Sequence, residues 1–141
     1  MVRITEIPGD LLQSPVSLAH CVSRDFHMGK GVAKEFKEKF GGVSELKGQR
    51  KGVGDVAYLQ RDGRFIFYLI TKERYFEKPR GYASLRRCFC CLARYCVSYE
   101  LTELAIPRLG CGLDGLKWTL VRLLIEEIFS DVEIQITVFL N

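Results

Sequence analysis

Three glycines and an aspartate stand close together in residues 107–115, Pro-Arg-Leu-Gly-Cys-Gly-Leu-Asp-Gly, directly after the apolar run 104–106. Glycine lets a backbone come close to a ligand, and N–H groups that turn toward one point attract an anion such as a phosphate. Asp114 is a carboxylate beside that surface, so we expect it to face a sugar or a reacting centre beyond the phosphates. The alternative is a plain strand-to-helix turn in which Asp114 caps the following helix.

A second glycine loop follows the apolar run 17–22. Residues 26–31, Phe-His-Met-Gly-Lys-Gly, precede a segment in which Val32, Phe36 and Phe40 recur at helical spacing. A strand, a Gly-x-Gly turn and a helix make a geometry in which backbone amides and the helix N-terminus receive a phosphate. Two such loops in one small chain favour a phosphate site more than either loop alone.

Lys72 follows the apolar, strand-like run 64–71 and is a candidate amine at the carboxyl end of a strand. A deprotonated amine can attack an electrophilic carbon, and a carboxylate within reach can exchange protons with it. The alternative for Lys72 is a solvated lysine at a strand end. If the strands before them are parallel neighbours, Lys72 and Asp114 meet the phosphate loops at one edge of the sheet.

Three other side chains are candidates for chemistry. His20 lies in the run 17–22, where we expect a packed, hydrogen-bonded histidine. His27 lies in the first glycine loop and could contact a ligand. Cys111 is a possible nucleophile, but no histidine is assigned beside it, so we expect it to fill space behind its loop. The aromatic side chain that would stack on a ligand is not identified by the pattern.

The composition indicates one globular domain of 141 residues, with 48% hydrophobic and 27% charged residues. No apolar run reaches the roughly 20 residues that cross a bilayer, and the N-terminus does not resemble a signal peptide, so we expect a cytoplasmic or nuclear protein without a membrane partner. The net charge of +4 would attract an anionic small molecule, but without a basic stripe it does not favour nucleic acid.

Six cysteines are expected to be free thiols in that compartment. Four of them crowd one predicted helix, at positions 88, 90, 91 and 96, without a second pair of ligands that would complete a zinc site. We therefore expect small buried residues on a helix face there. The sequence implies no metal and no cofactor.

The predicted elements alternate between strands and helices. Asp62-Gly63 between two β-rich runs predicts a hairpin, and the segments after Asp10 and at 44–47 could each form a helical turn. The predicted strands are 3–7, 17–22, 55–60, 64–71, 101–107 and 133–140, and the predicted helices are 32–40, 82–98 and 116–129. This order favours an α/β fold with three layers, α/β/α, around a mixed sheet. Asp10, Lys72 and both glycine loops then meet at the carboxyl edge of the sheet.

Six motifs spread over nearly the whole chain are specific when taken together: Gly9-Asp10-Leu11, Leu18-Ala19-His20-Cys21, Met28-Gly29-Lys30-Gly31-Val32-Ala33, Lys39-Phe40-Gly41-Gly42-Val43, Tyr68-Leu69-Ile70-Thr71-Lys72 and Pro107-Arg108-Leu109-Gly110-Cys111-Gly112-Leu113-Asp114. They resemble the macrodomain family, in the branch of the terminal ADP-ribose protein glycohydrolase, also described as an O-acetyl-ADP-ribose deacetylase. The resemblance implies a single macrodomain over residues 1–141 that binds ADP-ribose in a cleft.

The resemblance also assigns roles by matching motif. It implies that Lys72 and Asp114 are the catalytic pair and that Asp10 accepts a hydrogen bond from the adenine amino group. The first glycine loop would line the distal ribose and pyrophosphate, and the backbone of the second would hold the phosphates. The residues that it implies for ADP-ribose binding are Asp10, Leu11, His20, Met28, Gly29, Gly31, Val32, Thr71, Pro107, Gly110, Cys111, Gly112 and Leu113.

The chain departs from the family at two places. The second strand lacks the Asn-Ala-Ala-Asn stretch of the commoner macrodomains, so their asparagine-and-water chemistry is not transferred. Lys30 stands where this branch usually has a small residue, which changes the shape expected for the first glycine loop.

From the resemblance we expect a hydrolase that removes mono-ADP-ribose from glutamate and aspartate side chains and deacylates O-acyl-ADP-ribose. Our hypothesis is that Lys72 attacks the anomeric carbon of the opened distal ribose while Asp114 moves protons. A non-catalytic module that binds ADP-ribose is the alternative, and a phosphatase acting on ADP-ribose 1″-phosphate would use the same cleft. The expected partners are ADP-ribose and mono-ADP-ribosylated proteins, and we expect a monomer.

Overall fold

The computed structural model describes residues 1–78, 81–112 and 114–140. The elements in chain order are β1 (Arg3–Pro8), a 3-10 turn η1 (Leu11–Gln13), β2 (Ser17–Ser23), α1 (Gly31–Phe40), α2 (Val43–Gly48), β3 (Val56–Arg61), β4 (Arg64–Lys72), α3 (Ala83–Ser98), β5 (Glu103–Ile106), α4 (Trp118–Ile128) and β6 (Gln135–Leu140). The predicted order of strands and helices is confirmed, and η1 and α2 are the two short helical turns.

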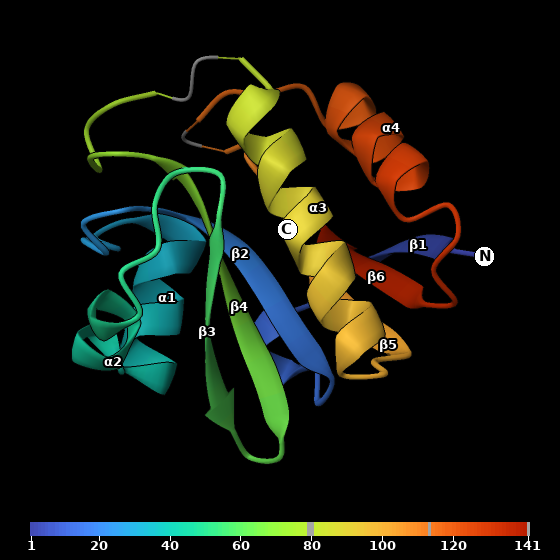
Figure 1. The fold of residues 1–141 in the computed structure, drawn as a ribbon, viewed down its shortest axis with the longest axis horizontal. Coiled ribbons are helices and arrows are strands. Elements are labelled where there is room, and N and C mark those ends of the chain that lie inside the picture. The colour runs from blue at the N-terminus through green and yellow to red at the C-terminus, as the bar shows by residue number, and fades with distance from the viewer. Residues whose placement is uncertain (79–80, 113, 141) are drawn as a thin grey trace.

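The strands form one six-stranded sheet in the order β1-β6-β5-β2-β4-β3. All neighbouring pairs are parallel except β3 with β4, so the sheet is mixed, as predicted. The carboxyl ends of the five parallel strands therefore lie at one edge, where the loops that follow them gather (Figure 1).

Helices cover both faces of the sheet, which confirms the three-layer architecture. The helices α3 and α4 pack on one face, and α1 and α2 pack on the other (Figure 1). Alternate residues of β4 belong to the two cores: Phe67 and Leu69 face α3 and α4, whereas Ile66, Tyr68 and Ile70 face α1 and α2. Because both faces of β4 are buried, its sequence is a continuous apolar run.

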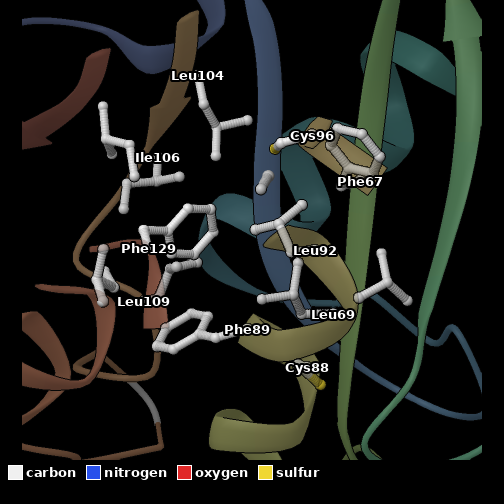
Figure 2. Packing of buried hydrophobic residues seen from close by; sticks show 14 of the residues in the cluster. Phe67, Leu69, Cys88, Phe89, Leu92, Cys96, Leu104, Ile106, Leu109 and Phe129 are labelled. Atoms are coloured by element: carbon white, nitrogen blue, oxygen red, sulfur yellow. The ribbon is translucent and has the colours of Figure 1, made fainter. Parts of the chain in front are cut away.

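The larger core lies between α3, α4 and the sheet. Figure 2 shows Phe89 and Leu92 of α3 packed with Phe129 and with Leu104 and Ile106 of β5. All the residues predicted for the inner face of α3 are buried, namely Leu85, Phe89, Leu92 and Cys96.

The cysteines of α3 depart from the prediction at one position. Cys88, Cys91 and Cys96 are buried, but Cys90 is exposed because it lies on the outer side of the helix. All six cysteines of the chain are free thiols. Among the described residues, no group of three or more His, Cys, Asp or Glu side chains is placed to hold a metal ion. None of the helices in the described ranges is both long enough and apolar enough to span a membrane.

Helix α4 is shorter than predicted. It begins at Trp118 rather than at Leu116, because the N–H group of Leu116 donates to the carbonyl of Gly110 at 2.8 Å and leaves the helical path. Its apolar stripe is also narrower than predicted, since Leu120 and Leu123 are 44% and 55% exposed.

The hairpin between β3 and β4 is confirmed. Arg61 pairs with Arg64 across a two-residue turn, in which Asp62 and Gly63 have φ of +55° and +75°. Two successive positive φ angles are typical of the type I′ turn, whose twist matches that of the flanking strands.

A side chain pairs with the edge strand β3 as if it were backbone. The amide of Gln49 donates to the carbonyl of Tyr58 at 2.7 Å and accepts from the N–H group of Tyr58 at 3.0 Å. Both outward-facing backbone groups of Tyr58 are therefore satisfied.

The turn residue Gly63 provides a test of the hairpin. A Cβ at Gly63 would meet no atom within 4 Å, so Gly63→Ala adds only backbone strain at a positive φ. We expect it to lower the free energy of unfolding by about 1 kcal/mol in urea titrations. Gly48→Ala is the matched control, because Gly48 also has open space but lies in α2, where alanine is favourable. An equal loss in both variants would contradict the turn assignment.

Candidate active site

Four segments converge at the carboxyl edge of the sheet, as the sequence predicts. Asp10 follows β1, the 26–31 loop follows β2, Lys72 is the last residue of β4, and the 107–115 loop follows β5. Since β5, β2 and β4 are adjacent in the sheet, the two glycine loops and Lys72 are neighbours.

Lys72 and Asp114 form a direct contact between two of these segments. The Nζ atom of Lys72 donates a hydrogen bond to Oδ1 of Asp114 at 2.7 Å. The side chains are 15% and 13% exposed, so most of the pair is shielded from water while part of it stays open to the surface. A charge-assisted bond of this length is a short path along which a proton can pass from an ammonium to a carboxylate.

The backbone around Lys72 is held on both sides. The N–H group of Arg24 donates to the carbonyl of Lys72 at 2.8 Å, and the register of β2 against β4 shifts at Ser23. The hydroxyl of Ser84, at the start of α3, donates to the carbonyl of Thr71 at 2.9 Å. A register shift of this kind re-aims the side chain beside it, here Lys72 at the end of its strand.

The 107–115 loop winds back on itself. The N–H group of Gly115 donates to the carbonyl of Gly112 at 3.1 Å, and that of Leu116 donates to Gly110 at 2.8 Å. Gly110 has φ of +73°, and a Cβ there would lie 2.8 Å from the Leu116 side chain. Glycine is therefore favoured at position 110 by the backbone conformation, while the Leu116 methyl group would have to shift to admit a side chain.

Gly112 is the open part of this loop. It is exposed, and no atom lies within 4 Å of the position that its Cβ would take. In the described part of the chain its N–H group donates to no backbone carbonyl. An exposed amide in such a turn can donate to a phosphate oxygen. Pro107, also predicted to contact the ligand, is half-buried, and Leu113 lies outside the described residues.

Asp114 does not cap the following helix, which removes that alternative. The N-cap of α4 is Lys117, whose N–H group donates to the hydroxyl of Tyr82 at 3.1 Å. The carboxylate of Asp114 contacts Lys72 instead.

Cys111 lies behind the loop, as predicted. Its thiol donates to the carbonyl of Leu109 at 3.4 Å and is half-buried. Burial raises the pKa of the Cys111 thiol, with a smaller opposing effect from Arg108. Cys111 is therefore a thiol rather than a thiolate, which does not suit a nucleophile.

The 26–31 loop leads into a helix N-terminus without a side-chain cap. The N-cap of α1 is Lys30, with an extended backbone at φ of −145° and no side-chain hydrogen bond to the helix. The first N–H groups of α1 therefore remain available to an anion. Gly29 and Gly31 are exposed and Val32 is half-buried, and the Lys30 side chain is exposed rather than packed into the loop.

Asp10 has an aromatic neighbour that the sequence analysis missed. The Oδ1 atom of Asp10 accepts from the N–H group of Leu12 at 3.0 Å, and the residue is exposed. The ring of Phe139 lies 3.2 Å from the position that a Cβ of Gly9 would take, so it covers the residue next to Asp10. The available signal was the place of Phe139 near the carboxyl end of the last strand.

Four residues predicted to contact ADP-ribose have buried side chains. The exposed fractions are 3% for Leu11, 1% for His20, 4% for Met28 and 4% for Thr71. These side chains support the edge of the site from the core, and a ligand at the surface would reach these positions through the backbone.

His20 is packed as predicted, but not hydrogen-bonded. Its ring centroid lies 3.8 Å from that of Phe36 and 4.7 Å from that of Tyr68. Among the described residues, neither ring nitrogen has a hydrogen-bond partner. Burial lowers the pKa of His20 from 6.5 to about 3, so the ring is neutral at physiological pH.

Comparison with known proteins places the chain near one characterised hydrolase. The chain is 50% identical over 139 residues to the ADP-ribose glycohydrolase OARD1 of Homo sapiens, which covers 97% of this chain and 91% of that protein. The OARD1 of Bos taurus matches with the same identity and coverage. No protein-family model matches the chain.

Solved structures share the fold. The macrodomain of Thermus aquaticus DarG superposes with a TM-score of 0.87 at 25% identity, covering 99% of both chains. The macrodomain of Mycobacterium tuberculosis DarG gives 0.85 at 25% identity over 97% of both. Thermosipho africanus DarTG, solved in complex with ADP-ribose, gives 0.84 at 22% identity over 98% of this chain and 41% of that one.

The low pKa of His20 predicts a pH-dependent stability. The pKa of His20 is 6.5 in the unfolded chain and about 3 in the folded protein. Between these pH values the unfolded state therefore binds more protons than the folded state. Stability should therefore fall as the pH decreases, and His20 should account for about 2 kcal/mol between pH 6.5 and roughly pH 5. Urea titrations at pH 6.5 and roughly pH 5 should show that the free energy of unfolding of His20→Leu lacks this contribution. An identical pH-dependent loss in the two proteins would contradict a neutral buried ring.

Proposed function

We propose an activity from one premise: the chain belongs to the macrodomain family, in the branch of the ADP-ribose glycohydrolase OARD1. On that premise the protein is a hydrolase that removes mono-ADP-ribose from glutamate and aspartate side chains of proteins and deacylates O-acyl-ADP-ribose. The observation that carries the proposal is the 2.7 Å contact between Lys72 Nζ and Asp114 Oδ1, beside both glycine loops.

ADP-ribose would lie along the carboxyl edge of the sheet. The exposed amide of Gly112 and the uncapped N-terminus of α1 are donors for the pyrophosphate. Asp10 would accept a hydrogen bond from the adenine amino group, and the Phe139 ring beside it would stack on the base. This orientation leaves the distal ribose near Lys72.

The first step transfers ADP-ribose to the enzyme. The bond to be broken joins the acidic side chain to C1″ of the distal ribose, whose ring can open only after that bond has been replaced by the bond to lysine. Lys72 gives a proton to Asp114, and its free amine attacks C1″. A C–N bond forms while the C–O bond to the acyl group breaks, and the carboxylate of the substrate protein leaves.

Water completes the reaction. Asp114 carries the proton from the first step and returns it as the lysine adduct is resolved. Water adds at C1″, the C–N bond breaks, and the products are ADP-ribose and the Lys72 amine. The sum of the two steps is the addition of one water across the ester.

A module that only binds ADP-ribose is the alternative function. Such a module needs the glycine loops but neither Lys72 nor Asp114. A shielded amine and carboxylate in contact favour the enzyme, because desolvation of the two charges offers a binding module no benefit.

Removal of the amine separates the two functions. We expect Lys72→Ala to lower the release of ADP-ribose from a glutamate-linked mono-ADP-ribosylated protein by at least roughly a thousandfold, and Asp114→Ala by roughly a hundred- to ten-thousandfold. Free ADP-ribose should still bind both variants in calorimetry. Lys47→Ala, on the exposed side of α2, is the control and should keep wild-type activity. Wild-type rates in Lys72→Ala would remove Lys72 from the mechanism.

The adenine end can be tested by binding alone. We expect Phe139→Ala and Asp10→Ala each to weaken ADP-ribose binding by about tenfold, because each removes one contact with the base. Ribose 5-phosphate, which has no adenine, should bind the wild type and both variants equally. Unchanged affinity for ADP-ribose in both variants would contradict the proposed orientation.

A further inference from the structure

Exposed aromatic rings line the rim of the candidate site. The rings of His27 and Tyr75 are stacked, with centroids 3.8 Å apart and an interplanar angle of 19°. The ring of Phe76 meets Tyr75 edge-on at 5.5 Å. Tyr75 and Phe76 are 51% and 67% exposed, and His27 is exposed as well. Tyr75 is the third residue after Lys72, and His27 belongs to the 26–31 loop, so the stacked pair joins two of the segments that form the candidate site.

Asp25 ties together the two loops that carry this pair. Its Oδ1 atom accepts from the hydroxyl of Ser23 and from the N–H group of His27, and its Oδ2 atom accepts from the N–H group of Tyr75 at 3.1 Å. Burial favours a higher pKa for Asp25, but the hydrogen bonds from Ser23, Tyr75 and His27 outweigh it and lower the pKa. The carboxylate is therefore a fixed acceptor between the loops.

His27 is held outward by an unfavourable backbone conformation of the two residues beside it. Phe26 and Met28 have φ of +51° and +46°, and their side chains are buried. Left-handed backbone at residues other than glycine persists where packing imposes it. The His27 ring also covers Gly29, since a Cβ there would lie 2.7 Å from Nε2. His27 thus joins the first glycine loop to Tyr75.

The chain that carries the modified residue must leave the site past one of the neighbouring surfaces. The acidic side chain to be released lies at Lys72, and the 107–115 loop is occupied by the phosphates in the proposed function. Residues 24–25 and 73–77 adjoin Lys72, since the N–H group of Arg24 donates to the carbonyl of Lys72, and they border an open surface hollow. The residues that line this hollow are Arg24, Asp25, Glu73, Arg74 and Glu77.

Resting on the proposed function, we propose that the stacked pair of His27 and Tyr75 contacts the polypeptide that flanks the modified glutamate or aspartate. Flat exposed rings held in a fixed position offer contact area to a main chain and its side chains at little entropic cost. The pair is a specificity-determining surface and takes no part in bond breaking. An acetyl ester carries no polypeptide that could contact the pair, so the pair distinguishes protein-linked from small acyl substrates.

Kinetics on two substrates test the inference. With a peptide that carries ADP-ribosyl-glutamate, Tyr75→Ala should raise KM roughly five- to tenfold and leave kcat unchanged. With O-acetyl-ADP-ribose both constants should stay at wild-type values. Tyr75→Phe keeps the ring and should behave as wild type. Equal changes on both substrates would reveal a purely structural role and overturn the inference, as would a wild-type KM for the peptide in Tyr75→Ala.

Binding gives a second test that does not need turnover. In the Lys72→Ala background, the modified peptide should bind more tightly than free ADP-ribose, and the additional change Tyr75→Ala should remove this difference. Tyr99→Ala is the control, because that ring is 40% exposed but stacks on Phe65 at the opposite edge of the sheet. An unchanged affinity ratio in Tyr75→Ala would overturn the inference. Failure of the wild type to cleave either substrate would count against the proposed function, while the affinity ratio would still decide this inference.

Discussion

Parallel pairing of β2 with both β4 and β5 is the constraint on which the rest of the site depends. Parallel strands end at the same edge, so the loops after β2 and β5 and the last residue of β4 are brought together without any contact specific to a ligand. The antiparallel strand β3 makes this possible, because its hairpin reverses the chain and lets β4 run alongside β2. If β4 ran in the other direction, Lys72 would end at the far edge, away from Asp114.

The contact between Lys72 and Asp114 is better explained by chemistry than by stability. A shielded ion pair loses much of its solvation, and apolar residues of the same size are often as stabilising. The surrounding core does not need the pair, since both faces of β4 are already packed by α1 to α4. Its position beside two loops with available amide groups therefore suits a site in which charge is moved during a reaction.

Features set by local backbone chemistry could be predicted from the sequence, and features set by distant partners could not. Asp62 and Gly63 specify the hairpin by themselves, and the glycine loops mark the strand ends that they follow. The late start of α4 depends on the bond from Leu116 to Gly110, which interrupts a periodic apolar pattern. The ring of Phe139 lies near Asp10 because the first and last strands pair. Sequence spacing alone does not predict which strands pair. The proximity of Lys72 and Asp114 was predicted because Lys72 ends β4 and Asp114 follows β5, and both strands run parallel to β2 between them.

The side chain of Gln49 has a consequence for the protein in concentrated solution. A strand at the border of a sheet offers free donors and acceptors, and a strand from another molecule can add to them and begin aggregation. At Tyr58, the middle of β3, both of these groups are already taken by one amide from the same chain. Gln49 thus interrupts the row of free backbone donors and acceptors along the edge strand β3, which another molecule would need in order to extend the sheet.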